Sequence, residues 1–186
     1  EFKLNLQQTF LFSTLAWLMI AIFGCLPFLL SPESFSISEA FFESMSGITT
    51  TGATVITDLD NTPKSILLWR AIMQWLGGIG IVVMAITILP LLKVGGMQLF
   101  KMEGPDTTEK ILPRTIEVAT IIISTYLILT FTCGFFYWFF GMSLFDSVAH
   151  SMTTIATGGF STHNDSIGFF ESSNIEIVAS IFIIMG

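Results

Sequence analysis

The sequence predicts an all-α membrane protein made of two tandem repeats, each with a span, a half-length helix, a Thr-Gly turn and a second span. Two observations lead to this fold class. First, 52% of the 186 residues are hydrophobic and 11% are charged, against about 25% charged in an average soluble domain. Second, two runs in which threonine precedes glycine, 49–54 and 155–160, each lie between a short capped helix and an apolar stretch.

The overall charge and the two cysteines narrow the classes of function. The net charge is −7, whereas a nucleic-acid-binding protein needs basic patches, so no nucleic-acid partner is expected. Cys25 and Cys133 both lie inside apolar stretches. Because they have no metal-type spacing, we interpret them as buried packing residues.

The first half of the chain has the elements of one such repeat. Residues 9–30 carry no charge and reach the length of about 20 residues that a membrane crossing needs. Ser36 and Glu39 have the spacing of a capping box, which starts a helix expected to end near residue 47. At 1.5 Å per residue this helix is about 15 Å long, so it enters a bilayer core of about 30 Å without crossing it. The first Thr-Gly run follows, and residues 66–90 form the second span.

The same order of elements recurs in the second half. Residues 115–140 form the third span, and Ser143 and Asp146 repeat the capping signal. The second half-length helix is expected to end near residue 154. After the second Thr-Gly run, a last span begins near residue 175.

These elements divide the chain into a first repeat, a linker and a second repeat, at residues 1–90, 91–114 and 115–186. Gly52 and Gly158 lie 106 residues apart, whereas the caps Ser36 and Ser143 lie 107 apart. We therefore expect one residue of slip in the second half-length helix or its turn. The last span is cut short, so the chain is expected to be a fragment of a longer protein.

Lysine and arginine predict the orientation in the membrane. Five of the seven basic residues lie before the first span or in the linker: Lys3, Lys93, Lys101, Lys110 and Arg114. The positive-inside rule makes these segments cytoplasmic, so the Thr-Gly turns open to the outer side. Nine of the fourteen acids fall in the outer segments: Glu33, Glu39, Glu43, Asp58, Asp60, Asp146, Asp165, Glu171 and Glu176. They form an acidic mouth that concentrates cations, or they are simply solvated loop charges.

The Thr-Gly turns fit the chemistry of a selectivity filter for a monovalent cation. A dehydrated cation needs several oxygens at once, and backbone carbonyls supply them without a permanent charge. Gly52 and Gly158 lack a Cβ and can adopt the backbone angles that aim successive carbonyls at one axis. The half-length helix before each turn points the negative end of its dipole at the same place. A pair of helix-linking loops without an ion is the alternative interpretation.

Several stretches resemble the N-terminal half of a TrkH-type potassium uptake protein, in the superfamily that also holds the Ktr and plant HKT transporters. The resemblance extends over essentially the whole chain. It is most specific where Gln-Trp-Leu-Gly-Gly-Ile-Gly accompanies a Thr-Thr-Gly turn. The matching stretches are Phe41–Ala53, Trp69–Ala71, Gln74–Gly80, His150–Ser151 and Ala156–Thr162.

The resemblance implies a pore like that of potassium-channel subunits, built from four span, pore helix, filter loop, span repeats on one chain. This chain would hold two of the four, and each repeat would donate one filter glycine, here Gly52 and Gly158. The potassium ligands would be backbone carbonyls of the filter segments: Thr50, Thr51, Gly52, Ala156, Thr157 and Gly158. Ala156 stands where the first repeat has Thr50, which removes a hydroxyl and keeps the carbonyl.

The resemblance also implies the setting in which the chain acts. The expected function is potassium uptake across a bacterial inner membrane, with K⁺ as the transported ion and no cofactor. The expected partners are membrane lipid, the missing C-terminal repeats of the same protein, a second copy in a homodimer, and a cytosolic nucleotide-binding regulatory subunit.

Other polar and small residues in the spans and turns are interpreted as structural. Arg70 is expected to reach the outer interface or to pair with an acid, rather than to sense or gate the ion. His150 is interpreted as a packed, hydrogen-bonded histidine, and His163 is assigned no role. Close helix contact, rather than a hinge, is expected of three glycines: Gly77, Gly78 and Gly80.

Three other functions were weighed, and two of them, a carrier and a non-conducting subunit, stay open as alternatives. A re-entrant-loop secondary carrier for a small solute would want a charged anchor at the membrane midplane, and the sequence offers none in these spans. An intramembrane hydrolase would need paired acids, a His-Glu-x-x-His motif or a Ser/His couple; the sequence lacks them, so the chain is not expected to be an enzyme. A non-conducting membrane subunit is the third alternative.

Overall fold

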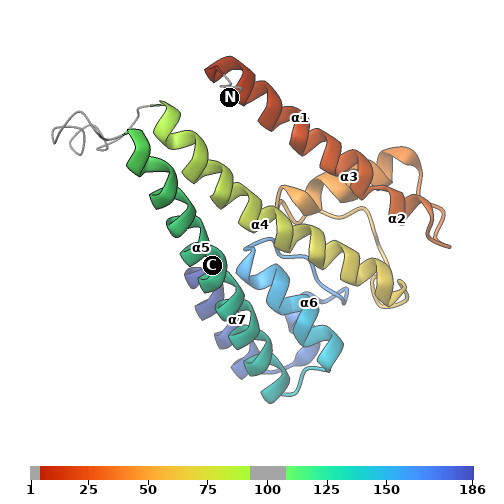
Figure 1. Ribbon diagram of the computed structural model, residues 1–186. Coiled ribbons are helices and arrows are strands. Elements are labelled where there is room, and N and C mark those ends of the chain that lie inside the picture. Colours follow the sequence, from red (N-terminus) through yellow and green to blue (C-terminus); the bar gives the residue numbers. More distant parts are fainter. Residues whose placement is uncertain (1–4, 93–107) are drawn as a thin grey trace.

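The computed structural model describes residues 5–92 and 108–186 (Figure 1). Side chains are described for residue 5 and for residues 7–84 and 117–186. Within these ranges all regular structure is helical, which confirms the predicted fold class. Most of the predicted linker lies outside the described residues.

The first half of the chain folds as a long helix, a half-length helix and a second long helix. Helix α1 covers Leu6–Gly24 and is followed, after Cys25, by the short α2 at Leu26–Leu29. The break falls where Pro27 would place its ring against the carbonyl four residues earlier. The half-length helix α3 covers Ile37–Ile48, and the second long helix α4 covers Lys64–Leu92.

The second half repeats this order. Helix α5 covers Thr108–Phe139 and the half-length α6 covers Leu144–Ile155. The 3₁₀ helix η2 at Ser166–Phe170, which the sequence analysis does not predict, lies in the segment that leads to α7 at Ser173–Met185. Helix α5 begins inside the predicted linker, seven residues before the expected start of the third span at residue 115.

Both half-length helices begin at the predicted caps. The Ser36 side chain accepts a hydrogen bond from the Glu39 backbone N–H, and the Glu39 carboxylate accepts one from the Ser36 N–H, which is a complete capping box. Ser143 accepts in the same way from the Asp146 N–H. The first and last residues of α6 each lie 107 residues after those of α3, so the two helices contain no slip.

Helix α4 lies between the two half-length helices and contacts both of them (Figure 1). In addition, α3 packs against α1, while α6 packs against α5 and α7. Cys133 is fully buried in a core cluster with Tyr137 and Phe182, and Cys25 is buried beside Phe28 in a cluster of the first half. The interpretation of both cysteines as packing residues is therefore confirmed.

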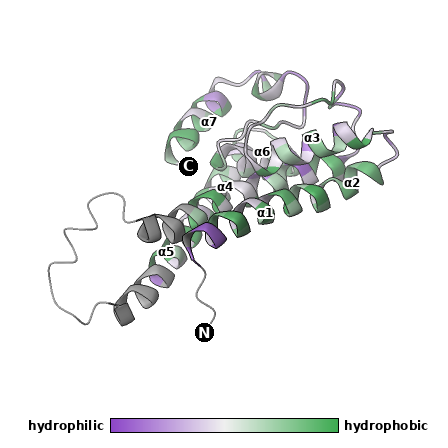
Figure 2. Cartoon of the chain, turned by 90° about the horizontal axis from the view of Figure 1, so that it is seen from above, coloured by the Kyte–Doolittle hydropathy of each residue, from purple (hydrophilic) through white to green (hydrophobic). Residues whose placement is uncertain are grey.

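The long helices have the composition and exposure of membrane spans. Three described segments are long and apolar enough to cross a bilayer: Gln7–Leu29, Lys64–Met84 and Glu117–Phe139. Apolar residues follow these helices along their length, and polar residues gather toward the connecting segments (Figure 2). Large apolar side chains such as Phe12, Phe131 and Ile184 are more than half exposed. In a bilayer they contact lipid, so their exposure carries no hydrophobic penalty.

Candidate functional site: two Thr-Gly loops on either side of helix α4

The first Thr-Gly loop leaves α3 through a Schellman motif. The Thr50 N–H donates to the Gly47 carbonyl, and the Thr51 N–H donates to the Ser46 carbonyl, both at 3.0 Å. The second loop leaves α6 through the same pair of bonds, from Thr157 to Thr154 at 3.0 Å and from Gly158 to Thr153 at 2.9 Å. The two loops therefore begin with one backbone geometry.

Each loop places a threonine in a conformation that threonine normally avoids. Thr50 has φ 55° and Thr157 has φ 53°. A left-handed conformation is rare for a β-branched residue and costs about 1–3 kcal/mol, which the surrounding structure must offset. Two residues later each loop is left-handed again, at Gly52 with φ 78° and at Gly159 with φ 79°.

These angles correct the alignment of the two repeats. The slip expected in the second helix or turn is wrong, because helix ends, Schellman bonds and left-handed residues all recur at an offset of 107. Gly52 therefore corresponds to Gly159, not to Gly158. Thr157 corresponds to Thr50, so the threonine is kept and the expected substitution by Ala156 at that place is also wrong.

The glycines of the loops are required for different reasons. A Cβ on Gly52 would overlap the carbonyl oxygen of Gly158, so the two loops touch at this point. A Cβ on Gly158 would overlap the side-chain amide of Gln74. Gly159 has open space around the Cβ position and is constrained by its positive φ alone.

Gln74 of α4 joins the second loop to the helix. Its Nε2 donates to the Gly158 carbonyl at 2.9 Å, and its Oε1 accepts from the Phe160 N–H at 3.1 Å. The side chain is fully buried. Gln74 falls in a stretch that resembles the family, but no role was predicted for it. The signal that could have identified it is an amide side chain within a membrane span, where a polar group needs a partner.

Arg70, one turn before Gln74, forms a buried ion pair with Glu43 of α3. Arg70 Nε lies 2.6 Å from Glu43 Oε1, and the two side chains are 1% and 0% exposed. Glu43 also accepts hydrogen bonds from the Thr54 hydroxyl at 2.8 Å and from the Val55 N–H at 3.1 Å. The expectation that Arg70 pairs with an acid is confirmed. The alternative interpretation of Glu43 as a solvated loop charge is wrong, because its side chain is buried.

The same arginine also reaches the second loop. Its Nη1 donates to the Ser161 carbonyl at 3.1 Å, and its guanidinium carbon lies 4.1 Å from the centre of the Phe160 ring. A guanidinium over an aromatic face is attracted to the electrons of the ring. Arg70 thus binds the segment after the second turn directly, and it is linked to the segment after the first turn through Glu43.

His150 occupies the position in α6 that Glu43 has in α3, 107 residues earlier. Its Nε2 lies 3.0 Å from the Ser161 hydroxyl, just as Glu43 binds the hydroxyl of Thr54, and its Nδ1 lies 2.9 Å from the Asp146 carbonyl. A carbonyl can only accept, so a neutral ring carries its proton on Nδ1 and accepts from Ser161 through Nε2. At 2% exposure, His150 is the packed, hydrogen-bonded histidine that was expected.

His163 connects the two repeats at the end of the bundle where the half-length helices begin. Its Nδ1 lies 2.7 Å from Asp60 Oδ1 and its Nε2 lies 3.5 Å from Asp146 Oδ1. Its ring stacks on Phe169 with the centres 3.6 Å apart. No role was predicted for His163, because its partner Asp60 is 103 residues away along the chain.

The Asp146 carboxylate is stabilised by several neighbours. Partial burial acts to raise its pKa, but hydrogen bonds from Ser143 and Thr162 and the nearby imidazole of His163 outweigh burial, so the pKa is lowered. Asp146 therefore stays ionised at neutral pH. It holds the start of α6 to the segment after the second turn through the 2.7 Å bond from Thr162.

Two of the three predicted contact glycines bring α4 against the ends of the half-length helices. A Cβ on Gly77 would overlap the carbonyl of Ile48, the last residue of α3. A Cβ on Gly78 would lie 3.1 Å from Ala156, which caps the end of α6. These two confirm the expected close contact. At Gly80 no close helix contact requires glycine, because an added Cβ would meet only the Trp17 ring at an ordinary distance of 3.5 Å.

Replacing Gly77 by alanine is expected to destabilise the protein by about 1–3 kcal/mol, the usual effect of overpacking. The atom in the way is a backbone carbonyl, which cannot move aside as a flexible side chain can. Thermal unfolding in detergent measures the effect. Gly80→Ala in the same helix is the matched control and is expected to be neutral or stabilising by up to about 1 kcal/mol. Equal unfolding midpoints for the two variants would contradict the contact.

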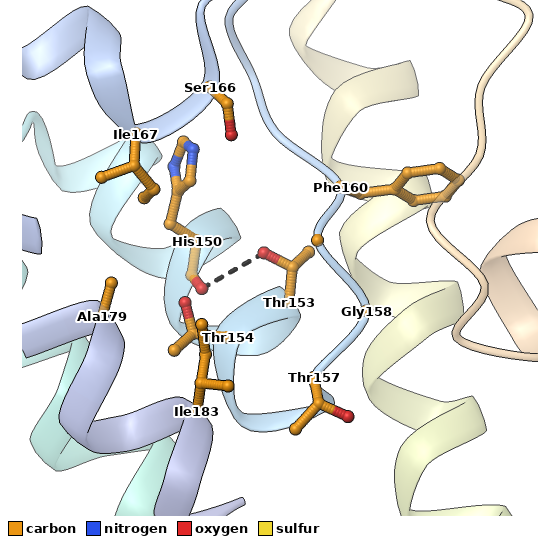
Figure 3. A pocket seen from close by; sticks show the side chains of 11 residues that line it. His150, Thr153, Thr154, Thr157, Gly158, Phe160, Ser166, Ile167, Ala179 and Ile183 are labelled. Carbon is orange, nitrogen blue, oxygen red and sulfur yellow. Dashed lines mark hydrogen bonds between the residues drawn. The ribbon is translucent and has the colours of Figure 1, made fainter.

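A cavity of about 250 Å³ lies beside the second loop. Ala179 and Ile183 of α7 form one side of it, and the backbone around Thr157 and Gly158 forms the other (Figure 3). Phe160 points away from it, toward α4 (Figure 3). The second loop therefore contacts α4 through Gln74 and Arg70 on one side, while its other side faces a cavity.

Comparison with known proteins shows the family of this chain. The family model for TrkH, described as a cation transport protein, matches residues 1–186. The chain belongs to the TrkH family. Over 98% of its length it is 46% identical to the Trk system potassium uptake protein TrkH of Escherichia coli (strain K12), and 47% identical to that of Halomonas elongata. The TrkH family is a family of transporters rather than enzymes, and it implies no cofactor.

A solved structure has the same fold. The crystal structure of the potassium transporter TrkH from Vibrio parahaemolyticus is similar with a TM-score of 0.79 at 43% sequence identity, over 92% of this chain and 34% of that one. The chain spans 38% and 39% of the E. coli and Halomonas relatives. The resemblance found in the sequence is therefore confirmed, for a chain that covers less than half of each relative.

Proposed function

We propose that this chain forms part of a pathway for potassium uptake and contributes two segments of a selectivity filter, residues 50–52 and 157–159. The observation that carries the proposal is the recurrence of one strained loop, with left-handed threonine and left-handed glycine two residues apart, at the ends of both half-length helices. Strain of this kind in non-glycine residues occurs chiefly at functional sites. The names of the relatives support potassium as the ion.

The chemistry of the proposed filter follows from the backbone. In an extended strand, successive carbonyls point to opposite sides. A left-handed residue at every second position turns the chain so that successive carbonyls can point to the same side. The carbonyls can then replace the water around a dehydrated ion, while the negative ends of the α3 and α6 dipoles favour a cation. We propose as ligands the carbonyls of Thr50, Thr51 and Gly52 in the first segment and of Thr157 in the second. Ala156 caps the end of α6, as Thr49 caps α3, and so precedes the second segment. Because the Gly158 carbonyl is bound by Gln74, we assign it to loop contact instead.

The rest of the arrangement follows as part of the same proposal. Two more repeats, supplied by sequence beyond the 38% of the relatives that this chain spans, would complete a ring of four filter segments. The loops would open to the outer side of a bacterial inner membrane, with residues 91–114 as a cytoplasmic linker between the repeats at 1–90 and 115–186. A homodimer and a cytosolic nucleotide-binding subunit are the proposed protein partners.

The contacts of Arg70 argue against a carrier for a small charged solute. Such a carrier needs an unpaired charge to hold its substrate. The charge that Arg70 brings into α4 is already paired with Glu43 and bonded to Ser161.

Rubidium uptake into liposomes containing the full-length protein tests the proposal. Uptake is expected to be suppressed by an excess of K⁺ and not by the same excess of Na⁺, since both K⁺ and Rb⁺ fit a carbonyl-lined filter. The 186-residue chain alone, reconstituted in parallel, reports whether two segments are sufficient. Equal suppression by Na⁺, or no uptake by the full-length protein, would overturn the proposal.

A further inference from the structure

We propose that Gln74 is a specificity-determining residue, which positions the second loop through its side-chain amide and so sets the preference for K⁺ over Na⁺. This inference rests on the proposed function. Gln74 does not line the filter; it acts through the loop backbone.

The amide holds two points of the loop at once. It binds the carbonyl of Gly158 and the N–H of Phe160, so a single planar group fixes the backbone on both sides of Gly159. Both partners are backbone atoms, which means that any shift of the amide shifts the loop itself. The side chain is fully buried, and water cannot replace it.

Gln74 also lies where the two loops meet. The carbonyl that it binds, that of Gly158, is the group against which Gly52 of the first loop packs. Its Nε2 lies 3.6 Å from the Cβ position of Gly52. The amide therefore controls how closely residues 50–52 approach residues 157–159. A filter distinguishes ions by the size of its sites or by the number and field of its carbonyls, and both depend on this approach.

The neutral amide is the side chain that these contacts require. An amide donates with its nitrogen and accepts with its oxygen, whereas an ionised carboxylate only accepts and an apolar side chain does neither. Glutamic acid in its protonated form has the same shape and the same pair of functions. This gives a variant whose function depends on pH in a way that the native residue's does not.

The test compares Gln74→Leu and Gln74→Glu in the full-length protein, with K⁺ against Na⁺ competition for rubidium uptake as the readout. Gln74→Leu is expected to lower the K⁺/Na⁺ competition ratio by about tenfold at every pH, since both hydrogen bonds to the loop backbone are lost. Gln74→Glu is expected to keep a ratio near the native value at acidic pH and to fall toward that of the Leu variant as its carboxyl ionises. The native protein and the Leu variant are measured over the same pH range as controls. A pH dependence of their ratios would come from other groups, such as Glu43, His150 and Asp146.

Thr130→Val is the matched control. It removes one hydrogen bond between α4 and α5, from Trp75 Nε1 to the Thr130 hydroxyl at 3.1 Å, without touching either loop. Its competition ratio is expected to equal the native one. A fall in this variant as large as in Gln74→Leu would show a general effect of loosening α4 and would overturn the inference.

The remaining outcomes separate the inference from the proposed function. A native protein that does not prefer K⁺ defeats the proposed function, and the inference with it. A selective native protein and an equally selective Gln74→Leu variant overturn the inference alone. If Gln74→Leu does not fold, the Glu variant carries the test: a fall in its ratio from acidic to alkaline pH supports the role of Gln74, and a constant ratio overturns it.

Discussion

Gly52→Ala is expected to abolish the preference for K⁺ over Na⁺. The new Cβ would overlap the Gly158 carbonyl of the other loop, and the backbone at this position has a φ of 78° that alanine adopts at a cost of about 1–2 kcal/mol. The loop must therefore either leave its left-handed conformation or push residues 157–159 aside. The expected result in rubidium uptake is a K⁺/Na⁺ competition ratio at least tenfold lower than in the native protein.

Two other glycines provide matched controls for this substitution. Gly141, between α5 and α6, also has positive φ, at 111°, but nothing lies near its Cβ position. Gly141→Ala should therefore lower the unfolding midpoint and leave the ion preference unchanged. Gly159→Ala should show the effect of the φ constraint in the second loop without a steric overlap. A Gly52→Ala protein with native ion preference would refute the assignment of residues 50–52 to the filter.

Breaking the Glu43–Arg70 pair from one side is expected to have the largest effect on stability. Arg70→Met leaves the buried Glu43 carboxylate without its cation, and Glu43→Gln leaves the buried guanidinium without its anion. Uncompensated buried charges of this kind typically cost about 3–5 kcal/mol. Each single variant should unfold at a clearly lower temperature in detergent and accumulate poorly in membranes.

The double variant Glu43→Gln with Arg70→Met distinguishes charge balance from local packing. It buries no charge, so it should be more stable than either single variant. It should still transport with altered selectivity, because the bond from Arg70 to Ser161 and the contact with Phe160 are lost. Asp165→Asn, at an exposed acid, is the control and should change stability by less than about 0.5 kcal/mol. Additive losses in the double variant would contradict the ion-pair explanation.

The half-length helices could be predicted from sequence because their signals are local. Ser36 with Glu39 and Ser143 with Asp146 place the two helix starts to the residue, since capping depends on neighbours three positions apart. The lengths of the apolar stretches likewise predicted the spans. These features require no knowledge of which parts of the chain meet in space.

The alignment of the two loops could not be predicted because residue type and backbone conformation disagree there. Glycine is the usual residue in a left-handed position after a helix, yet Thr50 and Thr157 occupy it in this fold. Gly158, in contrast, is a glycine with no positive φ. A larger residue is excluded there by the side chain of Gln74, 84 residues earlier. Contacts over such separations, like that of His163 with Asp60, leave no periodic trace in the sequence.

Glu43 and His150 hold equivalent positions, yet one is paired with arginine and the other is not. A pore assembled from identical subunits could not contain this difference, because each substitution would appear in every wall at once. Two repeats on one chain can differ, and here one has a buried ion pair where the other has a hydrogen-bonded histidine. In a chain with two repeats, each loop can therefore be altered by substitution without the same change in the other.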